Sequence, residues 1–230
     1  MERLREHKHL LLLGVLLAAL ITQPLVAREG TAARIAYDSL VAAVLVGVLL
    51  VVFRFRWERR IAIVLALPAV ALMILRYAVP ESNTVGARAA YSVSFALFFA
   101  FAVAVIVRDI FRSRAIHLDA VLGAFAGYLL LGVAWGSIYA AAEALAPGSF
   151  SVNPQIQWQL EDWHLRRALF NYLSFATMAS LGYNDITAVT PLANTLTWIE
   201  VMTAQFYLAV VIAQIVGIKL AQAIELRDRA

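Results

Sequence analysis

Between two long apolar segments of the chain, residues 170–185 read FNYLSFATMASLGYND. The surrounding residues 163–180 suit an amphipathic helix, but they are too short and too polar to cross a bilayer, which takes roughly 20 mostly apolar residues. A turn rich in Gly, Asn and Asp follows directly. A half-length helix and a turn between two full spans are typical of a re-entrant loop, which persists at membrane depth only where protein buries it or water lines it.

The composition of the whole chain indicates that its solvent is a lipid bilayer. Of its 230 residues, 63% are hydrophobic and 15% are charged, whereas soluble domains average roughly 45–50% apolar and about 25% charged residues. The absence of cysteine excludes disulfides and thiolate metal sites. The net charge of +4 comes from basic clusters between apolar runs, which is a pattern of membrane topology and not of nucleic-acid binding.

Six segments have the length and apolarity of transmembrane helices. They are residues 10–26, 37–53, 61–77, 89–107, 118–145 and 192–223. The first segment could instead be a secretory signal, which also joins a basic start to a short apolar run. Because Gln23-Pro24 is a poor context for cleavage, we expect this segment to remain as the first of six spans.

The basic residues predict the orientation, because Lys and Arg accumulate in cytoplasmic loops. Most of them fall on one side of a six-span chain: Arg3, Arg5, Lys8, Arg54, Arg56, Arg59, Arg60, Arg108, Arg112, Arg114, Lys219, Arg227 and Arg229. Fewer fall on the other: Arg28, Arg34, Arg76 and Arg88. We therefore expect a multi-pass protein of the plasma membrane with both termini in the cytoplasm.

Residues 177–185, TMASLGYND, resemble the potassium-channel signature, whose usual form is T-x-T-T-V-G-Y-G-D. The flanks resemble this family too, residues 170–175 its aromatic pore helix and residues 186–193 the start of its inner helix. The resemblance is specific from residue 163 to residue 217. It implies an all-α membrane protein with six transmembrane helices, a re-entrant pore helix and a selectivity-filter loop, assembled as a homotetramer. Residues 1–115 would form a four-helix domain resembling a voltage-sensor domain without gating charges, and residues 116–230 the pore domain.

The filter chemistry follows from the dehydration of the ion, because rings of backbone carbonyls from four chains can replace its water. The resemblance places potassium at the carbonyls of Ser180, Leu181, Gly182 and Tyr183, with Asn184 completing the filter. Carbonyls that point the same way need alternating backbone conformations, some with φ > 0, which Gly adopts freely and Asn tolerates. The C-terminal end of the half-helix would direct its partial negative charge at the cation.

The loop departs from the usual signature at four positions. Leu181 replaces Val, and Ser180 replaces Thr but keeps the hydroxyl. Ala179 replaces a Thr behind the filter, and Asn184 replaces the outer Gly, where a side chain must tolerate a glycine-like backbone. Strict potassium selectivity, weak selectivity and rapid filter inactivation are all compatible with these changes. The plain alternative is that residues 182–185 are a turn between two helices.

Three residues are predicted to support the filter: Tyr172, Ala179 and Asp185. Relatives often carry a Trp at the position of Tyr172, which bonds the aspartate after the filter, so we expect a hydrogen bond between Tyr172 and Asp185. The alternative is that Tyr172 is an interfacial tyrosine. Ala176 stands where some relatives place a carboxylate behind the filter, so that form of filter control is not expected.

Four ionisable residues lie near this loop. Glu161 and Asp162 precede the half-helix and would either cap its N-terminus or concentrate cations at the mouth. His164 is expected at the surface. Glu200 lies inside the last span, where ionisable residues usually face protein or water, and it would either pair with a group beside the filter or serve as a structural hydrogen-bonding residue.

In the last span, Ala204, Leu208, Ile212 and Val216 recur every four residues and are predicted to share one face. The resemblance aligns Ala204 with the hinge glycine of the inner helix. It makes this face the lining of the inner pore and its gate. Ordinary helix packing is the alternative.

The expected function is passive potassium conduction, without enzymatic chemistry and without any cofactor besides the permeant ion. The expected partners are further copies of the chain, membrane lipid and monovalent cations, and not nucleic acid. Residues 89–107 carry no charge, so no standard voltage sensor is expected. The alternatives are a weakly selective monovalent cation channel, and a transporter or regulatory subunit with a non-conducting loop, although a transporter more often shows internal repeats. A membrane enzyme is a third and weaker reading.

Overall fold

A computed structural model describes residues 8–26, 30–79, 84–113, 118–160, 162–182 and 185–228. In this part of the chain the fold is all-α, with seven α-helices and one short two-stranded sheet. The helices are α2 (Lys8–Val26), α3 (Thr31–Val51), α4 (Arg56–Ala78), α5 (Val85–Arg112), α6 (Leu118–Leu145), α7 (Trp163–Met178) and α8 (Pro191–Asp228). The strands are β1 (Phe150–Val152) and β2 (Ile186–Ala188), and a 3₁₀ turn, η2 (Gln157–Leu160), precedes α7.

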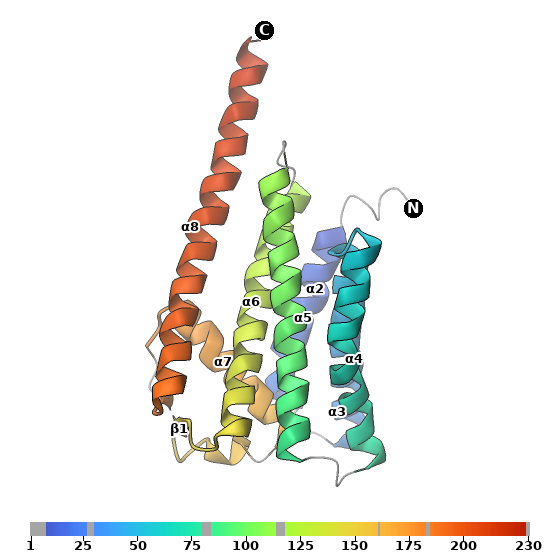
Figure 1. Ribbon diagram of the computed structural model, residues 1–230, viewed down its shortest axis with the longest axis vertical. Helices are drawn as coiled ribbons and strands as arrows, with labels where there is room; N and C mark the ends of the chain where they lie inside the picture. Colours follow the sequence, from blue (N-terminus) through green and yellow to red (C-terminus); the bar gives the residue numbers. More distant parts are fainter. Residues whose placement is uncertain are drawn as a thin grey trace.

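The long helices alternate in direction along the chain, so that α2 begins and α8 ends at the same end of the bundle (Figure 1). The short helix α7 is oblique. It starts at the opposite end, rises to the lower half of α8 and stops there, after which the chain returns to the end from which it came (Figure 1). The expected half-length helix between two longer helices is therefore present.

Within the described residues, four helices are long and apolar enough to cross a membrane, and they indicate a multi-pass membrane protein. They are Ala32–Val51, Val85–Arg112, Leu118–Leu145 and Pro191–Ile224. The prediction of six spans is met only in part. The apolar part of α2, His9–Gln23, is shorter than a span, and α4 is not among the four and begins with the charged sequence RWERR.

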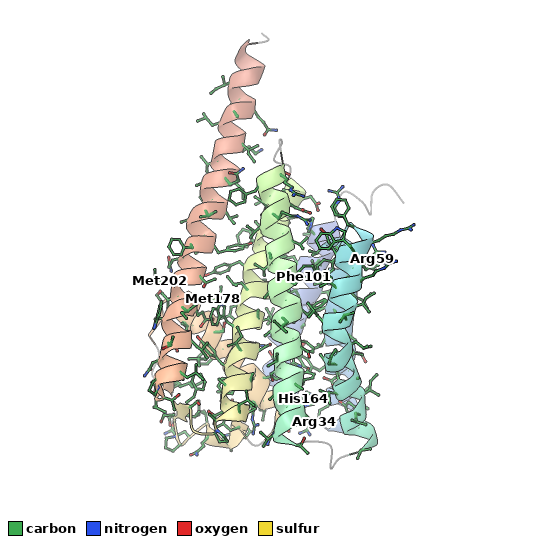
Figure 2. The ribbon with its side chains drawn as sticks, viewed as in Figure 1. Arg34, Arg59, Phe101, His164, Met178 and Met202 are labelled. Atoms are coloured by element: carbon green, nitrogen blue, oxygen red, sulfur yellow. The ribbon has the colours of Figure 1, made fainter. Side chains whose placement is uncertain are left out.

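Basic residues lie at both ends of the bundle. Arg59 in α4 lies at the end where α2 begins, and Arg34 in α3 lies at the opposite end (Figure 2). Arg108 and Arg112 lie in the last two turns of α5, and α5 ends at the end of the bundle where α2 begins (Figure 1). Several residues of the predicted clusters, among them Arg3, Arg5, Arg28, Arg114 and Arg229, lie outside the described residues.

Helix α6 is the centre of the packing, because α2, α5, α7 and α8 all contact it. Most of its residues are buried, on every side of the helix. Of the N-terminal helices, α2 and α5 thus pack against α6 of their own chain. The predicted domain boundary at residues 115 and 116 falls between α5 and α6, outside the described residues.

Candidate functional site

Helix α7 begins at a capped and charged N-terminus. The Asp162 carboxylate accepts hydrogen bonds from the backbone N–H groups of His164 (2.8 Å) and Leu165 (3.2 Å). These are two of the donors that the first turn of a helix leaves unsatisfied. The same carboxylate pairs with Arg34 of α3 at 2.7 Å. The predicted cap is confirmed for Asp162, whereas Glu161 lies outside the described residues.

His164 is buried, and its predicted position at the surface was wrong. Only 5% of this residue is exposed. Its ring meets the ring of Tyr37 edge-on, and its Nε2 lies 3.5 Å from the carboxylate of Asp38. The Tyr77 hydroxyl donates to the same carboxylate at 2.5 Å. Sequence reasoning missed this cluster because its members come from α3, α4 and α7.

Two arginines in the first turns of α7 make specific contacts, one with aromatic rings and one with a backbone carbonyl. The guanidinium of Arg167 lies over the rings of Tyr91 (5.2 Å) and Phe95 (4.9 Å) of α5, in cation–π geometry. Arg166 donates through Nε to the Leu160 carbonyl at 2.6 Å. Burial lowers the pKa of Arg166, and the charge of Arg88 lowers it further. The start of α7 is therefore fixed to the N-terminal helices by charged side chains.

The middle of α7 lies close against α6, at two glycines. A Cβ added to Gly136 would lie 3.0 Å from Asn171 Cα, and one added to Gly132 would collide with the Phe175 ring. Small residues spaced G-x-x-x-G let helix backbones approach closely in membranes. Residues 132–136 read GVAWG, so this signal was present in the sequence and was missed.

Helix α2 reaches α7 through a buried amide pair. Asn171 Nδ2 donates to Gln23 Oε1 at 2.8 Å, and both residues are buried. At its other end, α2 contacts α6 through His9, whose Nδ1 lies 2.7 Å from an Asp119 carboxylate oxygen. In the described part of the chain, α2 thus contacts both α6 and α7.

The C-terminus of α7 leads into the predicted filter loop. Ala179 is the C-cap, Ser180 N–H donates to Thr177 O at 2.9 Å, and Leu181 N–H donates to Ala176 O at 2.9 Å. With Ser180 left-handed at φ +55°, this is a Schellman motif, in which glycine is the usual left-handed residue. Gly182 is left-handed too, at φ +66°. Tyr183 and Asn184 lie outside the described residues.

The carbonyl oxygens of Ser180, Leu181 and Gly182 accept no hydrogen bond from the described residues. All three residues are exposed in the single chain. Unpartnered carbonyls are the groups that can replace the water of a cation. Among the described residues, no group of three or more His, Asp or Glu side chains is placed to hold a metal ion.

After the loop, Asp185 is held on two sides. The Tyr172 hydroxyl donates to Asp185 Oδ2 at 2.9 Å, so the predicted hydrogen bond is confirmed. The backbone N–H of Asn153 donates to Asp185 O at 2.9 Å. From there β2 pairs antiparallel with β1, Val152 opposite Ile186 and Phe150 opposite Ala188. The sequence did not predict these strands, which are three residues each.

Glu200 lies behind α7, at a point where three helices meet. It is fully buried. Its Oε1 is 2.5 Å from Ser174 Oγ of α7, and its Oε2 accepts a hydrogen bond from the Tyr139 hydroxyl of α6. Both partners lie within the helix packing, as expected for a structural hydrogen-bonding residue, and no contact in the described part of the chain joins Glu200 to residues 180–182. Ala176 is buried nearby without an ionisable group, so the buried carboxyl comes from α8 and not from α7.

The four residues predicted to line the inner pore do not share one environment. Ala204 is fully buried inside the chain and Leu208 is half-buried, whereas Ile212 and Val216 are 57% and 59% exposed. Each four-residue step advances about 40° around a helix with 3.6 residues per turn, so Val216 faces about 120° away from Ala204. Ala204 therefore belongs to the packing face, and the single-face prediction was wrong for this set.

Losing the Tyr172–Asp185 hydrogen bond is expected to loosen the loop without unfolding the protein. Tyr172→Phe removes one partly exposed hydrogen bond, worth about 0.5–1.5 kcal/mol, and should raise the amide hydrogen-exchange rate of residues 180–182 by about tenfold or less. Asp185→Ala should give a similar increase. The double variant should be no worse than either single one, because the pair acts as a unit. Fully additive effects would contradict this coupling.

The chain matches no model of a known protein family, no curated protein and no solved structure.

Proposed function

We propose that the protein is a homotetrameric channel of the plasma membrane that conducts potassium passively, with its termini in the cytoplasm. The observation that carries this proposal is the loop at the end of α7. Ser180, Leu181 and Gly182 offer three successive carbonyls that accept no hydrogen bond from the described residues, at the C-terminal end of a half-length helix, where the partial charge is negative.

The backbone of this loop favours the proposal over a simple turn. Ser180 and Gly182 have positive φ, and Leu181 between them does not. Alternating handedness turns successive peptide planes so that their carbonyls point to one side. A Schellman motif accounts for one left-handed residue after a helix, and Ser180 fills that place. Gly182, the second left-handed residue, is not part of this cap. Its left-handed backbone is the conformation that a path lined by carbonyls needs.

Four copies are required because each chain has one such loop, and a ring of ligands needs several. Helix α8 offers a surface for this assembly. Its large apolar side chains Trp198, Met202, Phe206 and Val210 are exposed in the single chain, and Met202 is labelled in Figure 2. Leu181 is 54% exposed in the single chain. Neighbouring copies and lipid would cover this apolar surface.

Ion flux in liposomes tests the proposal directly. Purified protein is reconstituted in vesicles loaded with KCl and diluted into NaCl, and the reverse gradient is measured in parallel, with valinomycin as the control for vesicle loading. We expect K⁺ flux well above Na⁺ flux, and a detergent-corrected mass near four times 25.3 kDa. Equal K⁺ and Na⁺ flux indicates a weakly selective cation channel. A monomer without flux indicates a transporter or regulatory subunit, and contradicts the proposal.

The conductance is expected to depend little on voltage. Residues 89–107 of α5 are uncharged, and the first arginine after them, Arg108, is paired with Glu58 of α4 and with Asp109. Voltage dependence comes from moving charge across the field, at about 2.3 kcal/mol per charge per 100 mV. Planar-bilayer recording over a wide voltage ramp should give no steep sigmoidal activation, and a steep curve with several gating charges would overturn this expectation.

A further inference from the structure

Three buried polar side chains that meet behind α7 are linked to one another by hydrogen bonds. Glu200 comes from α8, Ser174 from α7 and Tyr139 from α6, and all three are buried. Ser174 Oγ lies 2.5 Å from Glu200 Oε1 and 2.8 Å from the Gly132 carbonyl oxygen of α6. The Tyr139 hydroxyl donates to Glu200 Oε2.

The protons in this set can be counted. A serine hydroxyl has one hydrogen, and a backbone carbonyl can only accept. If Ser174 donates to Gly132 O, its oxygen must accept from Glu200, and this requires a hydrogen on Glu200 Oε1. Every group is then satisfied by one added proton, with Tyr139 donating to the other carboxyl oxygen. An ionised Glu200 would compete with Gly132 O for the single Ser174 hydrogen, and would be a buried charge without a cationic partner among these contacts.

We propose that Glu200, as a neutral carboxylic acid, is a positioning residue that couples α8 to the loop formed by residues 180–182. This inference rests on the proposed function, since the coupling matters only if that loop conducts. Ser174 is one turn before Met178, the last residue of α7, and its Oγ lies 3.9 Å from the sulfur of Met178. Met178 is buried. The loop follows directly and is anchored back to α7 by the Leu181 N–H bond to Ala176 O.

A displacement of α8 at Glu200 therefore pulls on α7 within one turn of the loop. The small residues of α6 make this transmission stiff, because Gly132 brings its backbone carbonyl within hydrogen-bonding distance of Ser174. Conversely, a change in the conformation of residues 180–182 displaces α8 through Ser174 and Glu200. The Glu200 carboxyl group connects α8 to α7 through Ser174 and to α6 through Tyr139.

The substitution Glu200→Gln separates a neutral acid from a charged one. The glutamine amide can donate to Ser174 and accept from Tyr139, so it reproduces the proposed pattern without a charge. We expect E200Q to keep the K⁺-to-Na⁺ flux ratio and the open probability of the unmodified protein within about twofold. E200A and S174A each remove the hydrogen bond between Glu200 and Ser174. Each should lower either the K⁺-to-Na⁺ flux ratio or the open probability about tenfold, the effect of losing one buried hydrogen bond.

Tyr207→Phe is the matched control. The Tyr207 hydroxyl of α8 is buried and donates to Ala124 O of α6 at 2.7 Å, so it joins the same two helices but bonds no residue of α7. Y207F should leave the flux ratio unchanged. Equal losses in E200Q and E200A, with the tetramer intact, would overturn the neutral-acid assignment, and a loss in Y207F as large as that in S174A would overturn the coupling.

An infrared measurement makes the outcome independent of conduction. Difference spectra of the full-length protein should contain a hydrogen-bonded protonated carboxyl band that disappears in E200Q and persists in Y207F. If the band is present while the unmodified protein carries no ion flux, the proposed function fails and the assignment of the neutral acid stands. If flux is present but the band is missing, the assignment fails and the proposed function stands.

Discussion

Replacing Gly182 with valine is expected to reduce K⁺ flux by about 100-fold or more while the protein still folds. Gly182 has φ +66°, and an added Cβ would meet no atom within 4 Å in the single chain, so the side chain itself has room. The backbone conformation is what changes, because a β-branched residue at positive φ costs roughly 1–3 kcal/mol. In a tetramer each of the four chains would carry this strain at the same ring of carbonyl ligands. Because each 1.36 kcal/mol added to the activation barrier lowers the rate tenfold, the summed strain predicts a loss of about 100-fold or more.

Gly148→Val is a matched control for this prediction. Gly148 lies in the turn after α6, has φ +86° and likewise has open space around its Cβ position. Both substitutions should lower the melting temperature by a similar amount. Only G182V should lose flux, measured in the same liposomes. Loss of flux in both variants would show that general destabilisation is responsible, and full flux in G182V would remove residues 180–182 from the conduction path.

The parts of the site that could be predicted from the sequence are those formed by residues close together in the chain. The half-length helix, its Asp162 cap and the Tyr172–Asp185 hydrogen bond all join residues within one short segment. Their geometry follows from helix periodicity and turn chemistry alone. The left-handed backbone expected for this loop was found as well, although at Ser180 and Gly182, while Asn184 lies outside the described residues.

The contacts between helices could not be predicted in the same way. Asn171 and Gln23 are 148 residues apart, and His164 and Asp38 are 126 apart. Which side chains meet depends on how each helix is rotated about its axis. A soluble amphipathic helix reveals this through its apolar stripe, but α6 is apolar on all sides and buried on all sides. The prediction that Ala204 and Val216 share one face of α8 was wrong for the same reason, since it rested on sequence spacing alone.

In a helix that is apolar on all sides, the spacing of glycines still indicates which face packs closely against another helix. The second prediction with a large expected effect concerns such a glycine of α6. Gly136→Val should prevent α7 from seating on α6, because the new Cβ would lie 3.0 Å from Asn171 Cα and 3.1 Å from Asn171 N. These are backbone atoms of a helix that is fixed at both ends, so they cannot turn aside as a side chain can. Overpacking costs roughly 1–3 kcal/mol, and displacing Asn171 also breaks its hydrogen bond to Gln23, at about 1 kcal/mol more.

The expected result for G136V is loss of the tetramer and of flux, with a large fall in melting temperature in detergent and a smaller one for G136A. Gly14→Val is the control, because Gly14 lies in the apolar helix α2 with no atom within 4 Å of an added Cβ. G14V should assemble and conduct normally. A normally assembled G136V would mean that α7 does not lie against α6 in the membrane, and the support that places residues 180–182 at their depth would then have to come from another helix.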